Sequence, residues 1–454
     1  MFYFGRVPSP LSTTVEYRDS HLPLNTRFCI IGAGTAGLTA ATVLKKSGYN
    51  QVTVFDKNDY IGGHCCTTSR GADIGAIVFS PSYPYNPGQL AQSLGLEVNY
   101  LEVRSQYYSL ITGKVEPYFN YVEKTQLLIE FIKYSWKHIF YKGVHFPRIV
   151  ETSEVLHQSW FDFTQTEGFV QIERATRGII RGGCYGKHHP ALYGVRMAQP
   201  RPLLKYILQP KHSVAKIEGG YQQLFEKLAD TYHINVKLGV ALQDINREHG
   251  IDITWLDSEL KSHKAHFDRL IIACNPQYLA SCILYTKEEN ALYNQLVFEP
   301  ICVYELNIKG ILQGQVGTIN LRENIDKDLN DRPLQVYKPY ADKELCVLYV
   351  RPSDTVSAET ILENIKNDFK LIGGEVTHVY TIKRWDDFNT TASKDSLCCG
   401  FFKKMERLQG ANYTAGIGLI YTFDLLPHVM AQAEDVTKRL IRRQLPSEGV
   451  NTDF

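Results

Sequence analysis

Three glycines near the N-terminus, Gly32, Gly34 and Gly37, have the types and spacing that phosphate binding needs. Residues 27–31 before them form a short apolar run that is typical of a buried strand. In such a unit the first glycine permits a tight turn, the second lets the backbone approach a pyrophosphate, and the third allows close helix packing. The start of the next helix would offer unpaired N–H groups to the phosphates. The spacing predicts a dinucleotide-binding loop.

An acidic residue, Asp56, follows at the place where such units bind ribose. Residues 38–46 are typical of a helix that ends at Gly48, and residues 51–55 form a second apolar run before the acid. A carboxylate there can accept hydrogen bonds from ribose hydroxyls and disfavours the 2′-phosphate of NADP. The order of elements therefore predicts a dinucleotide site. The alternative is a glycine-rich turn without a ligand.

A second group of glycines comes directly after the ribose acid. Gly62 and Gly63 precede His64, and Asp73 and Gly75 form a turn that opens another apolar segment. Consecutive glycines allow a second close approach of the backbone to a cofactor. We therefore expect two loops to contact the same ligand.

The composition limits what these elements can belong to. The chain has 454 residues, of which 44% are hydrophobic and 21% charged, and a net charge of +1. These values predict a globular protein of two or three units and argue against a nucleic-acid-binding protein. No apolar run is long enough to span a membrane, and the first 25 residues do not resemble a secretory signal. The ten cysteines contain no Cys-x-x-Cys pair, so we expect a reducing, cytoplasmic location.

The glycine loop, the ribose acid and the Gly-Gly turn together resemble the flavin-dependent amine oxidase superfamily, whose cofactor is FAD. The tail is similar as well, because residues 412–416 read Asn-Tyr-Thr-Ala-Gly and precede an expected helix from about Leu425 to Arg443. Residues 267–276 resemble the returning half of the FAD domain. A strand from Val236 to Ala241 would place the Val240 backbone against the adenine side.

Within this superfamily the chain most resembles the polyenoic fatty acid isomerase type. The similarity extends over residues 27–443. It is carried by these segments: 75–77 with 81–83, 159–163, 183–186 and 404–410.

The resemblance implies a set of cofactor-binding residues. They are Gly32, Gly34, Thr35, Ala36, Gly37, Asp56, Lys57, Gly62, Gly63, His64, Gly75, Ala76, Ile77, Val240, Cys274, Gly416 and Ile417.

Two of these positions depart from the pattern of the superfamily. His64 stands where an arginine is usual, and Ile417 replaces the acid that bonds the ribityl chain, which removes one cofactor bond but no backbone contact. Covalent attachment of the flavin through His64, the Cys65–Cys66 pair or the Cys398–Cys399 pair is an alternative to non-covalent binding.

The expected fold class is α/β, with two domains arranged as in amine oxidases. A discontinuous Rossmann-like FAD-binding domain takes residues 27–100, 212–285 and 390–454, after an N-terminal arm of residues 1–26. An α+β substrate domain with a mixed sheet takes residues 101–211 and 286–389. Strands are expected at 301–306 and 345–350, where apolar and polar residues alternate.

An amphipathic helix is expected at about 124–141. Its large apolar side chains are Leu128, Phe131, Ile132, Trp136 and Ile139. We expect this face to pack in the core; a helix that faces a membrane or a lipid channel is the alternative.

No metal site is expected. His188 and His189 with nearby Cys184 lack the separated ligand pairs of structural zinc.

The chemistry that the resemblance implies is hydride abstraction by the flavin, which needs no protein acid or base. One outcome is isomerisation or desaturation of an unsaturated fatty acid. The others are oxidation of an amine and a non-catalytic scaffold. A carboxylate substrate needs a cation, for which we select Arg104, with Arg196 and Arg201 as further candidates. The expected partner is a small-molecule substrate, with peripheral membrane contact left open and no prediction of the oligomeric state.

Overall fold

The computed structural model describes residues 21–83, 85–101, 104–117, 119–182, 186, 188–208 and 213–448, without the side chains of residues 104 and 178–182. Most of the expected N-terminal arm lies outside these residues.

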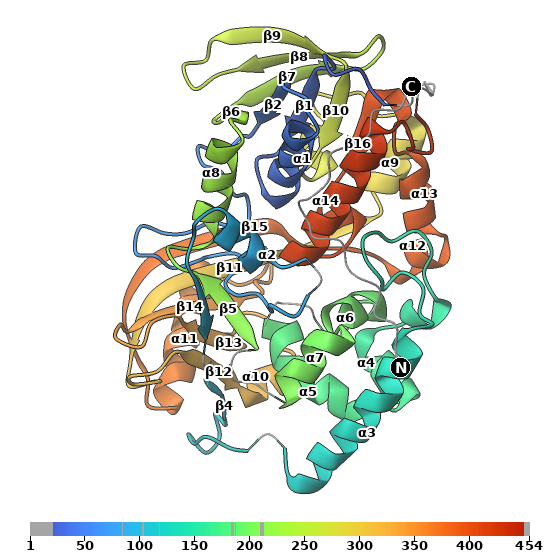
Figure 1. The fold of residues 1–454 in the computed structure, drawn as a ribbon. Coiled ribbons are helices and arrows are strands. Elements are labelled where there is room, and N and C mark those ends of the chain that lie inside the picture. The colour runs from blue at the N-terminus through green and yellow to red at the C-terminus, as the bar shows by residue number, and fades with distance from the viewer. Residues whose placement is uncertain are drawn as a thin grey trace.

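A five-stranded parallel sheet is built from segments far apart in the sequence (Figure 1). Its order is β16-β10-β1-β2-β6, with the strands β1 (Phe28–Ile31), β2 (Val52–Phe55), β6 (Asn235–Lys237), β10 (Arg269–Ile272) and β16 (Thr414–Gly416). The prediction of a single strand from Val236 to Ala241 is wrong. β6 ends at Lys237, and Gly239, with φ +62°, makes the turn into β7 (Ala241–Asn246).

Both faces of this sheet are covered, which explains why β1 is apolar throughout. Phe28 and Ile30 pack with helices α1 (Thr35–Lys46), α8 (Tyr221–Thr231) and α14 (Leu426–Ile441). On the other face β7, β8 (Ile251–Leu256) and β9 (Ser262–Phe267) form a meander, and the Phe55 ring lies 4.9 Å from that of Trp255. The strands of a parallel sheet buried on both faces lack alternation for this reason.

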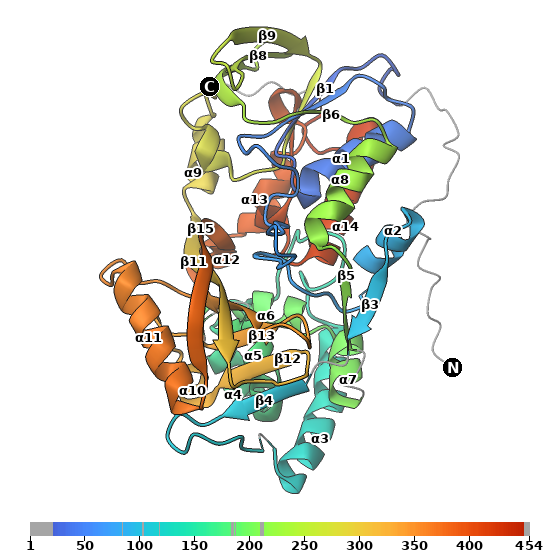
Figure 2. The ribbon, with the colours of Figure 1, turned by 90° about the vertical axis from the view of Figure 1, so that its left-hand side faces the viewer.

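The second sheet has six strands in the order β15-β11-β14-β13-β12-β4 and is mixed, because only β4 and β12 pair in parallel. Its strands are β4 (Arg104–Tyr108), β11 (Leu296–Lys309), β12 (Gly317–Leu321), β13 (Gln335–Lys338), β14 (Leu345–Val350) and β15 (Glu375–Ala392). Helix α11 (Ala358–Leu371) covers one face (Figure 2). The expected strands at 301–306 and 345–350 lie within β11 and β14.

A group of helices lies at the end of the molecule away from the β8–β9 hairpin (Figures 1 and 2). It contains α3 (Tyr121–His138), α4 (Trp160–Glu167), α5 (Val170–Gly182), α6 (Ala191–Met197) and α7 (Pro200–Leu208).

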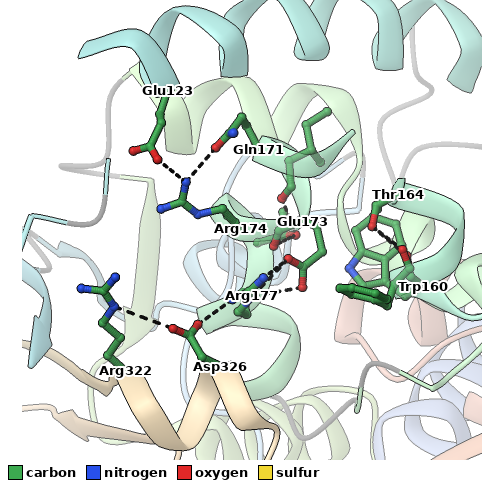
Figure 3. Close-up of polar contacts among 12 residues, drawn as sticks. Glu123, Trp160, Thr164, Gln171, Glu173, Arg174, Arg177, Arg322 and Asp326 are labelled. Carbon is green, nitrogen blue, oxygen red and sulfur yellow. Dashed lines mark hydrogen bonds and ion pairs between the residues drawn. The ribbon is translucent and has the colours of Figure 1, made fainter. Parts of the chain in front are cut away.

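Ion pairs hold α5 between its neighbours (Figure 3). Arg174 bonds Glu123 of α3 at 2.6 Å. Arg177 bonds Glu173 within α5 and Asp326 of α10 (Arg322–Lys327) at 2.5 Å.

The expected orientation of the helix near residue 124 is wrong. Only Phe131 of the chosen side chains is buried, while Leu128, Ile132, Trp136 and Ile139 are 43% to 70% exposed. The helix carries a second apolar face, and that face, with Leu127, Phe131, Tyr134 and His138, is the one that packs inward. Sequence periodicity could not decide between the two faces.

The remaining elements are short. They are α2 (Pro87–Ser93), the pair β3 (Val98–Leu101) and β5 (Val214–Ile217), α9 (Lys287–Tyr293), α12 (Lys394–Cys398) and α13 (Phe401–Arg407). The residue boundaries of the two domains stay a proposal. The strands of the parallel sheet lie within the proposed FAD-domain segments, whereas β15 runs three residues beyond the proposed boundary at 389.

Candidate cofactor and substrate site

A cavity of about 1080 Å³ lies between the parallel sheet and the mixed sheet. Its volume is at the upper end of the range for small-molecule sites, ~300–1000 Å³. Most of the predicted cofactor residues line it, namely Gly32, Gly34, Thr35, Ala36, Asp56, Lys57, Gly63, His64, Gly75, Ala76, Ile77, Val240, Cys274 and Ile417. Gly37, Gly62 and Gly416 are not among the residues that line the cavity.

The glycine loop has the backbone geometry that its sequence predicts. Gly32 turns out of β1 with φ +112°, and a side chain at Gly37 would collide with the Gly32 carbonyl. A Cβ at Gly34 would lie 3.6 Å from the Cα of Gly63, so the two glycine loops face each other. No side chain caps the N-terminus of α1, and its first turn contains no acid. This helix end can therefore accept an anionic group.

Asp56 lies at the end of β2, directly against the glycine loop. Its Oδ2 accepts the Ala33 N–H at 2.6 Å, and its Oδ1 accepts the Asn58 N–H at 2.8 Å. Burial raises the pKa of Asp56, although these hydrogen bonds act in the opposite direction. The Val240 N–H donates to the Asp56 carbonyl at 3.0 Å. Asp56 and Val240 thus border the same part of the cavity.

The tail turn is fixed by two glutamines that sequence reasoning missed. Gln409 donates to the Gly416 carbonyl at 2.8 Å and accepts its N–H at 2.9 Å, and Gln432 accepts the Gly418 N–H at 2.9 Å. Ile417 is 1% exposed, and its N–H donates to the Ile272 carbonyl of β10. The side chain that replaces the usual acid is therefore packed in the core at the cavity wall.

His64 lies in a cluster of acids and aromatic rings. Its Nε2 is 3.5 Å from Asp387 Oδ1, and its ring centroid is 4.9 Å from that of Trp385 and 5.2 Å from that of Phe388. Burial opposes a charge on His64, but the bond to Asp387 and the charge of Asp424 outweigh it and raise the pKa of His64. Burial raises the pKa of Asp424 to about 6.

The acids and rings of this cluster come from β15 and from the loop before α14, which sequence reasoning did not select. The run 383–388, in which Trp385 and Phe388 each follow two charged residues, was the available signal.

The other end of the cavity is formed by the second sheet and by α7. Ser105, Gln106 and Tyr107 of β4 line it, together with Leu203 and Tyr206 of α7. Two further rings, those of Tyr337 and Tyr349, complete this wall. The hydroxyl of Tyr349 donates to the Gly75 carbonyl at 2.6 Å, which ties the second sheet to the predicted cofactor loop.

The three candidate arginines lie in different environments. Arg104 is the first residue of β4, next to cavity-lining Ser105, but its side chain lies outside the described residues. Arg196 is fully buried, donates to the Gly143 carbonyl and to Thr422 Oγ1 at 2.7 Å each, and does not line the cavity. Arg201 is exposed on α7. Neither alternative to Arg104 borders the cavity.

The cysteines considered for flavin attachment fall in two places. Cys65 lines the cavity, where burial raises the pKa of its thiol to about 12. Cys398 and Cys399 are exposed and are not among the cavity-lining residues. The structure gives no support to attachment through the second pair.

His188 and His189 lie beside Glu299, a neighbour that their sequence position did not indicate. The two Nε2 atoms are 3.2 and 3.1 Å from the carboxylate oxygens of Glu299. Burial opposes ionisation of Glu299, but the two imidazoles hold its pKa well below the usual range. The ligand atoms lie within 4.8 Å of one another, and each imidazole already contacts the carboxylate. Cys184 lies outside the described residues.

Known structures share this architecture. The CLA-producing fatty acid isomerase from P. acnes aligns with a TM-score of 0.81 and 20% identity, over 92% of this chain and 99% of that one. Putrescine oxidase with bound putrescine aligns with a TM-score of 0.65 and 17% identity, with the same coverage of both chains. Cyclohexylamine oxidase from Brevibacterium oxydans IH-35A gives 0.65 at 14% identity, again with the same coverage.

Sequence comparison adds a domain match and two relatives. Residues 30–90 match the NAD(P)-binding Rossmann-like domain. The 1-hydroxycarotenoid 3,4-desaturase of Flavobacterium sp. (strain P99-3) is 41% identical over 80 residues, which are 17% of this chain and 16% of the desaturase. The uncharacterized protein R656 of Acanthamoeba polyphaga mimivirus is 22% identical over 484 residues, covering 93% of this chain and 94% of that protein.

These matches confirm the predicted α/β fold with two domains arranged as in amine oxidases and fatty acid isomerase. They also agree with the expectation of an enzyme, because the characterised relatives are oxidases, a desaturase and an isomerase.

Proposed function

We propose that this chain, which has the fold of amine oxidases and fatty acid isomerase, is an FAD-dependent enzyme that isomerises or desaturates an unsaturated fatty acid. The observation that carries the proposal is one continuous cavity, which joins the predicted FAD residues to a chamber walled by tyrosines and α7. The TM-score of 0.81 to the P. acnes isomerase exceeds the 0.65 of the two amine oxidases, which supports the fatty acid over the amine.

The residues present fit FAD. The uncapped N-terminus of α1 and the close approach of the two loops at Gly34 and Gly63 suit a pyrophosphate. Asp56 suits the ribose, and Val240 the adenine side. His64 and Ile417 would then lie toward the flavin. When bound, FAD supplies a hydride acceptor.

The contribution of the chain is to orient the substrate and to exclude water. Removing a hydride from a carbon between two double bonds needs the C–H held in place more than it needs a protein base. The Trp385 N–H donates to the Ile74 carbonyl at 2.9 Å, so this ring and Tyr349 close the wall between the two sheets. Returning the hydride to another carbon gives isomerisation without net redox change.

Oxidation of an amine is the second candidate, and one observation favours it. Asp387 and Asp424 place two carboxylates on the cavity wall, where they would attract a protonated amine. The same two acids would disfavour a fatty acid carboxylate beside them, although Lys57, Lys383 and Arg384 also line the cavity. We further propose a cytoplasmic location, which the cysteine content predicts.

Anaerobic reduction of the flavin by a panel of polyunsaturated fatty acids and amines tests the two functions. A product of unchanged mass with new conjugated-diene absorbance identifies the isomerase, and peroxide release in air identifies the oxidase. A protein that purifies colourless and takes up no added FAD would contradict both and would indicate a scaffold.

The position of the carboxylate is tested by Arg104→Leu, with Arg201→Leu on the exposed side of α7 as the matched control. Loss of a cation from an apolar site should weaken binding of the acid by about 2–4 kcal/mol. Binding of the methyl ester should be almost unaffected by Arg104→Leu, and an amine should bind the variant more tightly than the wild type. Unchanged kinetics of the acid would exclude Arg104 as its anchor.

A further inference from the structure

The outward face of α3 is strongly apolar. Val122, Ile129, Ile132, Trp136 and Phe140 are each 64% to 70% exposed and recur at helical spacing along α3 and the turn after it. The complete α3 face consists of these five residues with Tyr121, Leu128 and Ile139. Monomeric soluble proteins rarely expose so large a continuous apolar patch without a partner.

The charges around the α3 face are arranged asymmetrically. Both acids of the helix are turned toward α5, where Glu123 pairs with Arg174 and Glu130 accepts the Gln171 N–H at 2.7 Å. Lys124 and Lys133 lie exposed on either side of the apolar stripe, and the Lys133 ammonium group donates to the Glu167 carbonyl at 2.6 Å. The outward side of α3 thus combines apolar and aromatic groups with flanking cations.

The α3 face lies one helix away from the cavity. The Tyr134 hydroxyl on the inner side of α3 donates to the Ala198 carbonyl, just before α7, at 2.9 Å. On α7, Leu203 and Tyr206 line the cavity, while Leu204 and Leu208 are 37% and 59% exposed. Figure 2 shows α3 and α7 side by side. Helix α7 therefore separates the cavity from the surface beside α3.

We propose that the α3 face docks on an anionic lipid bilayer, with the helix lying in the interface. An apolar face containing tryptophan, with lysines at its edges, is the arrangement that inserts among head groups while its cations contact anionic lipids. No helix in the described part of the chain is long and apolar enough to span a membrane. A second copy of the chain fits less well, because a symmetric pair would bring the same lysines together.

Trp136 provides a direct measurement. The chain has four tryptophans, and the other three, Trp160, Trp255 and Trp385, are at most 8% exposed. Vesicles of phosphatidylcholine and phosphatidylserine should therefore shift the emission of the full-length protein to the blue and protect it from acrylamide. Brominated lipids should quench it. Pure phosphatidylcholine vesicles should bind more weakly, and added salt should weaken binding to the anionic ones.

The double variant Ile129→Ser/Ile132→Ser removes apolar contact and keeps the Trp136 reporter. Its partition into anionic vesicles should fall by about tenfold to a hundredfold. The matched control is Leu260→Ser/Leu284→Ser, which alters side chains that are 76% and 69% exposed, outside the α3 face. The control should bind as the wild type does.

Two results would overturn the proposal. The first is a wild type whose Trp136 emission is unchanged by vesicles of either composition. The second is a dimer in solution that the double variant converts to a monomer, because the α3 face would then be an interface between copies.

A consequence for substrate entry rests on the proposed function. If the substrate passes from the bilayer beside α7, the double variant should lose turnover of vesicle-borne fatty acid and keep turnover of monomeric fatty acid. Vesicle binding is measured without FAD or substrate, so its failure is distinct from failure of the proposed function.

Discussion

Asp56 combines a predicted ligand role with a structural one. Its two carboxylate oxygens accept the N–H groups of Ala33 and Asn58, and so hold the glycine loop against the end of β2. The residue that would bind ribose thus also shapes the loop for the pyrophosphate.

Replacing Asp56 should separate these two roles. Asp56→Ala should weaken FAD binding by about 1.5–3 kcal/mol, since a hydrogen bond to a charged group is lost. The substitution should also lower the stability of the apoprotein. Asp56→Asn keeps one hydrogen-bond acceptor, so it should lose less FAD affinity and less stability than Asp56→Ala. Titration of the apoprotein with FAD and denaturant unfolding measure the two effects. An unchanged dissociation constant in Asp56→Ala would exclude it as the ribose ligand.

We expect the buried carboxyl group of Asp424 to make the stability of the folded protein depend on pH. Its pKa in the folded protein is about 6, above the ordinary 3.8, because burial disfavours the charge. The folded state therefore binds this proton more tightly, and the stabilisation, complete below pH ~4, is lost as the pH rises through 6. Asp424→Asn should exceed the wild type in free energy of unfolding by about 3 kcal/mol at pH 8 and match it near pH 4.

Denaturant unfolding across this pH range measures the difference, and Asp386→Asn is the control, because its side chain is 68% exposed. A constant difference at all pH values would contradict the assignment. The charge of Asp424 also bears on the two proposed functions. Loss of that charge below pH 6 should improve KM for a fatty acid and worsen it for an amine.

At the scale of elements, ion pairs help to hold α5 in place, together with the buried apolar side chains of Ile172 and Ala175. Arg177 joins the buried carboxylate of Glu173 to Asp326 of α10, and Thr176 beside it lines the cavity (Figure 3). The position of this part of the wall thus depends on the ion pairs.

Arg177→Leu should lower the free energy of unfolding by about 2–4 kcal/mol, because the Glu173 side chain is 1% exposed and loses a forked partner. Lys142→Gln breaks the Lys142–Glu151 pair, whose side chains are 66% and 51% exposed, and should cost less than about 1 kcal/mol. Equal effects of the two substitutions in urea unfolding would show that burial does not decide the strength of these pairs.

For the whole molecule, the predicted cofactor residues come from segments near residues 32, 56, 63, 75, 240, 274 and 417. A ligand that binds all of them stabilises only the folded arrangement. FAD at about a hundred times its dissociation constant should raise the free energy of unfolding by about 2.7 kcal/mol. Thermal unfolding with and without FAD measures this gain.

Gly34→Glu is the control for that gain. Its carboxylate would point between the two glycine loops and repel a pyrophosphate, so FAD should no longer stabilise the variant. Gly34→Ala adds only a Cβ with ordinary contacts and should keep part of the effect. If FAD stabilised Gly34→Glu as much as it stabilises the wild type, the assignment of this loop to FAD binding would be contradicted.

Elements whose signal is local in the chain were predictable. The turn at Gly32, the helix that ends before Gly48, the strands at 301–306 and 345–350 and the C-terminal helix all lie where the sequence predicts them. Their signals are glycine positions, apolar periodicity and caps, which act over a few residues. The roles of the individual cofactor residues stay predictions.

What the sequence by itself determined is therefore the Rossmann-like unit, whose signals lie within neighbouring residues, and the fold class, through a resemblance that extends over residues 27–443. The tertiary structure alone decided that Asp387 and Asp424 meet His64, and which apolar face of α3 packs inward. Both depend on contacts between segments that are dozens to hundreds of residues apart. A helix with two apolar faces can bury either one, and only its neighbours, here α5 and α7, select which face meets the core and which meets solvent.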